Sequence, residues 1–231
     1  MKSIYILITL LIFLFKSGSS QNLNEDLVEM NSAYHLEKPM EFKVQYSYYD
    51  DNNMSIAKDT LTGEMIVCKS GFSYKIGKKV FLKNKRCAIK VDHRRKTIEL
   101  LNPALVSFDN NPLAMIDSLN KKYQPVSRII LDNKLRRSYR VTYAKGMIKT
   151  IDLTMFKKTH LIENIVIYFD KDIILRDDLN KSAVLKLNFS DYSNIRASVN
   201  ALSEEKYIRL EDQQAKLKEP FSHYQLINHL N

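Results

Sequence analysis

Alternation between apolar and polar residues runs through most of this sequence and restricts it to strands that bury one face. Between residues 41 and 48 the apolar positions are Phe42, Val44, Tyr46 and Tyr48, and the residues between them are polar. The same period of two recurs over 72–77, 79–83, 86–92, 96–101, 135–143, 150–155 and 183–189. Because successive side chains of a strand point to opposite faces, the pattern predicts a large antiparallel sheet with one apolar face.

Two segments follow the period of a helix instead. The first ends at Pro39 and has one apolar face, formed by Leu23, Leu27, Met30 and Tyr34. The second starts at Asn111 and Pro112, a capping residue and a favoured first helical residue, and its apolar face holds Leu113, Ile116, Leu119 and Tyr123. Strands that are interrupted by two helices predict an α+β fold.

The C-terminal residues have a different pattern from the rest of the chain. Ser203 precedes two acids, and a thin apolar stripe follows at Tyr207, Leu210 and Leu217. This pattern predicts a helix over residues 203–219 that Pro220 ends. We therefore divide the chain into a domain over residues 21–200 and a helical or irregular tail over residues 201–231.

Residues 1–20 have the features of a secretory signal peptide. Lys2 precedes an uncharged run from Ile4 to Phe15, and small residues follow at 17–20. The run of twelve residues is shorter than the roughly 20 that a membrane-spanning helix needs. Cleavage after Ser20 is expected, with an uncleaved anchor as the alternative. Cleavage would remove two lysines and lower the net charge from +10 to +8. An exported basic protein meets anionic membrane surfaces rather than nucleic acid.

Cys68 and Cys87 are the only cysteines of the chain. Export permits a disulfide, but the two Cα atoms of a disulfide must lie within about 7 Å of each other. Consecutive hairpins would place the two cysteines on non-adjacent strands. A bridge and two small buried thiols both remain open on the sequence.

The stretch from Lys78 to Lys96 holds nine lysines and arginines in nineteen residues. Most of them occupy predicted turns or alternate with Cys87, Ile89 and Val91. A half-buried antiparallel sheet needs polar residues at these positions, and lysines also discourage strand edges from pairing with other molecules. We interpret the stretch as a solvated face rather than as an anion site.

No set of residues indicates catalysis. The five histidines are scattered, the spacings of zinc sites are missing, and five glycines form no phosphate-binding loop. Asp50 and Asp51, like Asp170 and Asp172, lack the glycine and the terminal glutamate of a calcium loop. The sequence therefore predicts a protein that is not an enzyme and that has no cofactor and no metal ion.

Residues 24–190 resemble the outer-membrane lipoprotein carrier family, the LolA-like proteins. The resemblance lies in "LTGEMIVCKSGFSYKIGKKVFLKNKRCAIKVDHRRKTIELLNP" (61–103) and in "TIDLTMFKKTHLIENIVIYFDKD" (150–172). It implies a periplasmic protein with an incomplete β-barrel, a strongly curved sheet whose apolar side is covered by helices. The chain departs from the family in having no tryptophan and in its tail after residue 200.

In that family the space between sheet and helices receives acyl chains, so the resemblance also implies a ligand site. The inward-facing candidates on strands are Phe42, Val44, Tyr46, Phe72, Tyr74, Ile76, Ile89, Val91, Leu185 and Leu187. The helix residues opposite them are Leu113, Ile116 and Leu119. Periodicity does not distinguish a cavity from a filled core.

Two functional hypotheses follow. The first is a carrier or binder of an acylated lipid or lipoprotein, driven by burial of about 0.8 kcal/mol per CH₂ group. The second is a non-catalytic structural component of a cell-envelope assembly, which binds a partner protein through residues 201–231.

Overall fold

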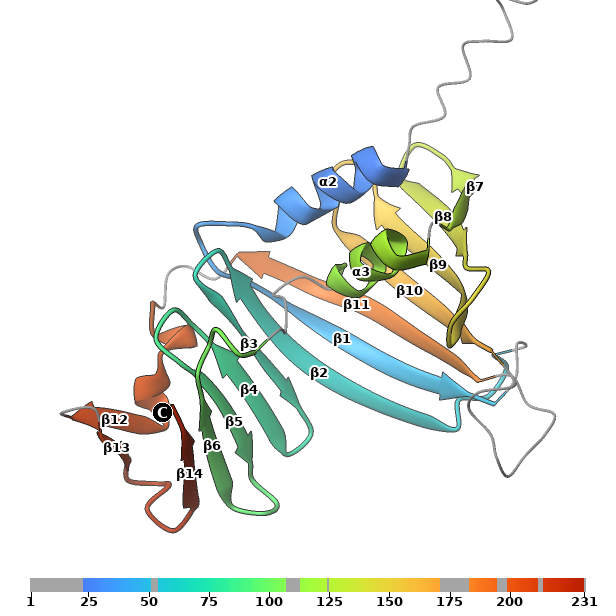
Figure 1. The fold of residues 1–231 in the computed structure, drawn as a ribbon. Coiled ribbons are helices and arrows are strands. Elements are labelled where there is room, and N and C mark those ends of the chain that lie inside the picture. The colour runs from blue at the N-terminus through green and yellow to red at the C-terminus, as the bar shows by residue number, and fades with distance from the viewer. Residues whose placement is uncertain are drawn as a thin grey trace, which may run out of the picture.

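Twelve strands form one open, curved sheet in the computed structural model, which describes residues 23–50, 54–106, 113–123, 125–170, 183–194, 199–211 and 214–230 (Figure 1). The strand order is β14-β6-β5-β4-β3-β2-β1-β11-β10-β9-β8-β7, and all neighbours are antiparallel except β14 and β6. The strands are β1 (Met40–Tyr49), β2 (Asp59–Cys68), β3 (Gly71–Ile76), β4 (Lys79–Lys83), β5 (Ala88–Asp92), β6 (Thr97–Leu101), β7 (Val126–Asp132), β8 (Arg136–Thr142), β9 (Ile148–Phe156), β10 (Ile162–Phe169), β11 (Val184–Asn194) and β14 (Gln225–His229). The predicted α+β class with a large antiparallel sheet is confirmed.

Short turns connect β2, β3 and β4, and two glycines make this tight arrangement possible. Gly71 starts β3 where β4 comes very close, since a Cβ there would lie 2.1 Å from the carbonyl oxygen of Lys83. Gly77 has a φ of +52° in the turn between β3 and β4, a conformation that glycine adopts without steric cost. The sequence thus accounts for the tight β2–β3–β4 meander.

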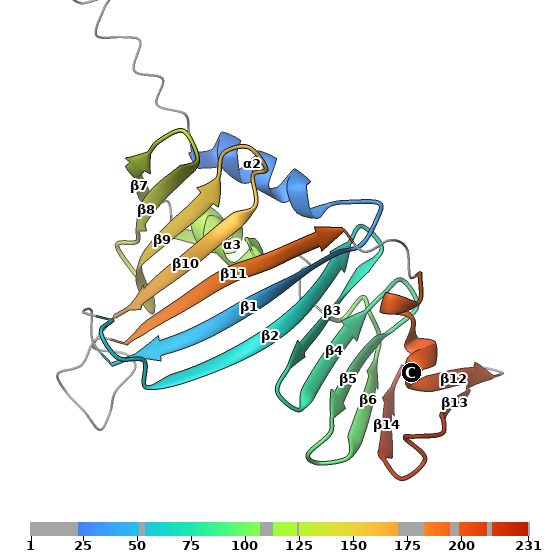
Figure 2. The same cartoon turned by 180° about the vertical axis from the view of Figure 1, so that it is seen from behind.

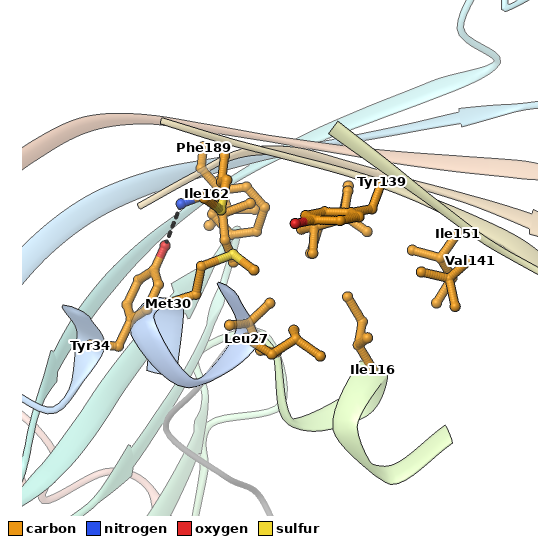
Figure 3. Close-up of a cluster of buried hydrophobic side chains, with 14 of the residues drawn as sticks. Leu27, Met30, Tyr34, Ile116, Tyr139, Val141, Ile151, Ile162 and Phe189 are labelled. Carbon is orange, nitrogen blue, oxygen red and sulfur yellow. Dashed lines mark hydrogen bonds between the residues drawn. The ribbon is translucent and has the colours of Figure 1, made fainter. Parts of the chain in front are cut away.

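The helices α2 (Leu23–Tyr34) and α3 (Ala114–Tyr123) cover one face of the sheet, which we call the helix-side face (Figures 1 and 2). Met30 of α2 points toward Ile162 and Phe189 of the sheet, and Ile116 of α3 points toward Val141 (Figure 3). These side chains belong to the first cluster, a core of buried residues that includes Leu23, Leu27, Met30, Tyr34, Phe42, Val44, Val67, Phe72, Leu113, Ile116, Tyr139, Val141, Ile151, Leu153, Ile165 and Phe189.

The apolar side of the sheet changes at β4. From β4 to β6 most of the buried apolar residues lie on the opposite face, which we call the outer face, and they form the second cluster with the C-terminal residues. The sheet contributes Val80, Leu82, Cys87, Ile89, Val91, Ile98 and Leu100, and the C-terminal residues contribute Tyr207 and Ile208, with Leu217, Phe221, Tyr224 and Leu226 packed around them. The sheet therefore has two cores, one on each face.

The helix predicted over residues 203–219 is wrong. Ser203 caps only a short 3-10 turn over Glu204–Lys206, and a hairpin of β12 (Ile208–Glu211) and β13 (Gln214–Leu217) follows. Ile208 lies directly opposite Leu217 and is completely buried. Burial of this face against β4–β6 favours the strands, because tertiary packing overrides a weak local helix preference.

Cys68 and Cys87 are free thiols, and both are buried. Burial, with a further contribution from Glu204, raises the pKa of the Cys87 thiol to about 11. The reactive thiolate of Cys87 should therefore be about 100-fold less abundant near neutral pH than in an unperturbed cysteine. We expect iodoacetamide to modify Cys87 far more slowly in the folded protein than in denaturant, as intact-mass analysis would measure. Equal rates in the two states would contradict this prediction.

The basic stretch 78–96 is largely solvated, as the sequence predicts, with Lys85, Arg86 and residues 94–96 exposed. The proposed signal peptide and the residues Asn111 and Pro112 lie outside the described residues. Within the described ranges, no helix is long and apolar enough to cross a bilayer.

Candidate ligand-binding site

An apolar row crosses the helix-side face and continues beyond the helices. Phe42 on β1 lies opposite Met65, Met65 opposite Tyr74, and Tyr74 opposite Phe81. Phe42 is completely buried, whereas the other three residues are only partly buried. The row thus runs from the closed core onto a surface that solvent reaches.

Two polar residues end this row. Phe81 lies opposite Lys90 on β5, and Lys90 lies opposite Glu99 on β6. The Nζ atom of Lys90 is 3.0 Å from Oε1 of Glu99. The helix-side face therefore changes from apolar to charged between β4 and β5, which matches the change of the buried side described above.

Tyr46 and Tyr74 form a hydroxyl pair in the middle of the partly buried region. Their ring centroids are 6.4 Å apart, and the side chains share a hydrogen bond. Gly63 makes room for the pair, because a Cβ there would lie 3.0 Å from Cε2 of Tyr74 and 3.1 Å from the carbonyl oxygen of Lys75. Leu61 lies directly opposite Tyr46 on β2 and is 49% exposed.

Burial raises the pKa of both hydroxyls of this tyrosine pair. For Tyr46 the hydrogen bond to Tyr74 raises the pKa further. The pair therefore stays neutral at physiological pH and offers donors and acceptors without charge. Such a pair can bind an ester, amide or carboxyl group next to an apolar surface, but it supplies no charge for acid–base chemistry.

Side-chain contacts fix helix α2 over the sheet at both of its ends. In its first turn, Asp26 accepts hydrogen bonds from Arg137 Nη1 at 2.8 Å and from the Tyr139 hydroxyl. In its last turn, the Tyr34 hydroxyl accepts from the backbone N–H of Ile162 at 3.2 Å (Figure 3). Burial raises the pKa of Tyr34 to about 12. The first cluster is thus closed beneath α2, and the accessible apolar surface lies beside the helices.

The structure divides the residues that the sequence predicts for the ligand site. Fully buried in the first cluster are Phe42, Val44, Phe72, Leu113 and Ile116. Partly buried residues that pack against this cluster are Tyr46, Leu119, Leu185 and Leu187. The strand register places Tyr74 and Ile76 on the same face, both half-buried.

Ile89 and Val91 do not lie on the helix-side face. Both are completely buried in the second cluster, on the outer face. The expectation that they face the helices is therefore wrong for these two residues. Alternation assigns residues to two faces but does not say which face is covered by which segment, and here the C-terminal residues cover the second one.

Three residues of the accessible surface are absent from the sequence-based set, namely Leu61, Met65 and Phe81. Leu61 and Met65 lie on β2 at a spacing of two from Gly63, and their face is set by the pairing with β1. The sequence contains this alternation, but it predicts a strand over about residues 63–69 only, which excludes Leu61. Alternation does not assign Phe81 to a face, because Val80 and Leu82 beside it are also apolar.

A hollow of about 650 Å³ lies on the outer face between the sheet and the C-terminal residues. Its charged lining is balanced, with Glu41, Glu64 and Glu205 against Lys75, Lys206 and Lys218. Lys75 and Glu64 pair at 3.3 Å. Because these charges balance, the hollow favours neither an anionic nor a cationic ligand. We therefore place the candidate site on the helix-side face. Among the described residues, no group of three or more His, Cys, Asp or Glu side chains could hold a metal ion.

The structure defines an α+β protein with an open curved sheet, two helices over one face and an accessible apolar surface beside them. No family model matches the chain, and no curated protein sequence matches it. An uncharacterized conserved protein from Thermus thermophilus has a similar solved structure, with a TM-score of 0.51 and 10% sequence identity over 90% of this chain and 100% of that chain. This similarity shows the fold alone.

Two other solved structures are less similar. A LolA superfamily protein from Nitrosomonas europaea has a TM-score of 0.38 and 11% identity, over 79% of this chain and 98% of that one. The complex of MucA and MucB from Pseudomonas aeruginosa gives a TM-score of 0.36 and 11% identity, over 84% of this chain and 62% of that one. The resemblance to the LolA superfamily is therefore weak and confined to the fold.

Proposed function

We propose that the protein is an exported, periplasmic binder of an acylated lipid or lipoprotein, without catalytic activity. The acyl chain lies on the accessible part of the helix-side face, around Leu61, Met65 and Tyr74. The observation that carries the proposal is that the apolar face of the sheet continues past the closed first cluster onto partly exposed side chains.

The surface around this region fits an amphiphile. Apolar side chains from β1, β2, β3 and β11 provide contact for an alkyl chain, at about 25 cal/mol for each Å² removed from water. The tyrosine pair can donate a hydrogen bond to the ester or amide that links the chain to its head group. Lys90 and Glu99 at the end of the row mark the polar side, where the head group lies.

Leu61→Gln tests this proposal without disturbing the core, because Leu61 is 49% exposed. We expect the full chain to bind a fluorescent fatty acid such as cis-parinaric acid. The variant should bind it about fivefold to tenfold more weakly, since roughly 1–1.5 kcal/mol of apolar contact is lost. Fluorescence titration measures the affinity.

Ile56→Gln is the matched control, because Ile56 is an exposed apolar residue outside the strands of the site, with 83% exposure. It should bind the fatty acid as the unmodified protein does. If both variants lose affinity equally, or if the unmodified protein binds no acyl chain, the proposed site is wrong. Native mass spectrometry of the protein from its own envelope fraction adds a second readout, an extractable acyl lipid.

The alternative hypothesis, a partner that docks on residues 201–231, is weakened by the second cluster. Tyr207 and Ile208 are buried in this cluster with residues of β4, β5 and β6. Because these C-terminal residues are part of the second cluster, they are not a free segment that could dock on a partner. We therefore do not assign partner binding to them.

A further inference from the structure

Exposed apolar side chains are concentrated at one edge of the sheet. Ten large hydrophobic residues are exposed in the described chain. Five of them lie between residues 126 and 135, in β7 and the turn after it. We call them the edge patch: Val126, Ile129, Ile130, Leu131 and Leu135, which are 37% to 75% exposed. Figures 1 and 2 show β7 at the end of the sheet farthest from β14. Apolar residues clustered in this way indicate an interaction surface.

Basic residues surround the edge patch. Arg128 and Lys134 are exposed, and neither forms an ion pair with another described residue. Lys122 precedes the patch at the end of α3 and lies 5.0 Å from the Tyr123 ring centroid. The only acid between residues 121 and 136 outside α3 is Asp132, which pairs with Lys157 at 2.7 Å and with Arg137 at 3.2 Å. The exposed charge beside the patch is therefore positive.

The backbone of β7 is poorly suited to pairing with another strand. The register against β8 shifts between Ile129 and Leu131, so that Ile130 has no partner residue there. Such a bulge twists an edge strand and is one of the features by which proteins prevent edge-to-edge pairing. Pro125 just before the strand has no N–H to donate. An added strand is therefore a poor partner for this edge.

We infer that the edge patch is a membrane-docking surface that inserts Val126, Ile130 and Leu135 into the interface of an anionic bilayer, with Arg128 and Lys134 near the lipid phosphates. Proteins bind such interfaces by burying apolar side chains among the lipids and by the attraction of flanking Lys and Arg residues to anionic head groups. The surface is separate from the acyl-binding site around the tyrosine pair and does not depend on it.

A local fluorescent probe on the full chain tests this inference. Leu135→Cys is labelled with the environment-sensitive dye NBD, and both native cysteines are buried. On addition of vesicles that contain phosphatidylglycerol, we expect a blue shift and an increase of NBD emission. Adding Arg128→Ala or Lys134→Ala should each raise the lipid concentration at half-maximal change about fivefold, as expected for one lysine or arginine near the surface. High salt should weaken the response.

Leu105→Cys, labelled in the same way, is the control, because Leu105 is 80% exposed and follows β6, which is far from β7 in the strand order. A local probe is needed because the apolar residues 4–15 could themselves bind vesicles. An equal shift at both positions, or an equal response to pure phosphatidylcholine, would overturn the inference. A shift without lipid that grows with protein concentration would identify a second copy of the chain as the occupant, which also overturns it.

Discussion

Asp26→Ala is expected to lower the free energy of unfolding by about 3–5 kcal/mol, because it leaves Arg137 as a buried charge without its main partner. The side chains of Asp26 and Arg137 are only 6% and 7% exposed, and they are joined at 2.8 Å. At roughly 2–4 °C per kcal/mol for a chain of this size, the melting temperature should fall by about 6–20 °C. Differential scanning calorimetry and urea unfolding measure the two quantities.

Asp117→Ala is the matched control for this prediction. Asp117 also lies in the first turn of a helix and pairs with Lys121 at 2.7 Å, but both side chains are largely exposed. Its loss should cost no more than about 1 kcal/mol. Replacing both buried partners, as in Asp26→Leu with Arg137→Met, should recover most of the lost stability, since no charge is then left unpaired in the core. If Asp26→Ala costs no more than Asp117→Ala, the buried pair is not what fixes α2.

Much of the fold could be predicted from the sequence because its signals are local. Alternation around Phe42 and Val44 predicts the central strand β1, which the structure confirms. The apolar face of α2 is also correct, including Met30 and Tyr34, because a spacing of three and four residues places them on one side of a helix. These predictions depend only on residues that lie within about four positions of each other in the chain.

The pairing of Asp26 with Arg137 could not be predicted in this way. The two residues are 111 positions apart, and each is ordinary in its own segment, an acid at a helix start and a basic residue in an alternating strand. The assignment of Ile89 to the wrong face has a related cause. Its burial depends on residues more than 100 positions later in the chain, which no local period reveals.

Ile208→Ala is expected to destabilise the protein by about 2–5 kcal/mol, since it leaves a cavity in the second cluster. Ile208 is completely buried and lies opposite Leu217 in the β12–β13 hairpin. A helix with Tyr207, Leu210 and Leu217 on its apolar stripe would leave Ile208 outside that stripe, and its truncation would then cost little. The substitution therefore separates the strand in the structure from the helix that local sequence favours.

Arg209→Ala provides the comparison, because the adjacent side chain is exposed and its loss should change stability by no more than about 0.5 kcal/mol. Urea unfolding of both variants, with hydrogen exchange of β5 and β6, locates the effect. We expect faster exchange in these two strands for Ile208→Ala only, because the second cluster covers their outer face. Equal stability of the two variants would mean that the C-terminal residues do not pack on the sheet, and would restore the view of a detachable docking arm.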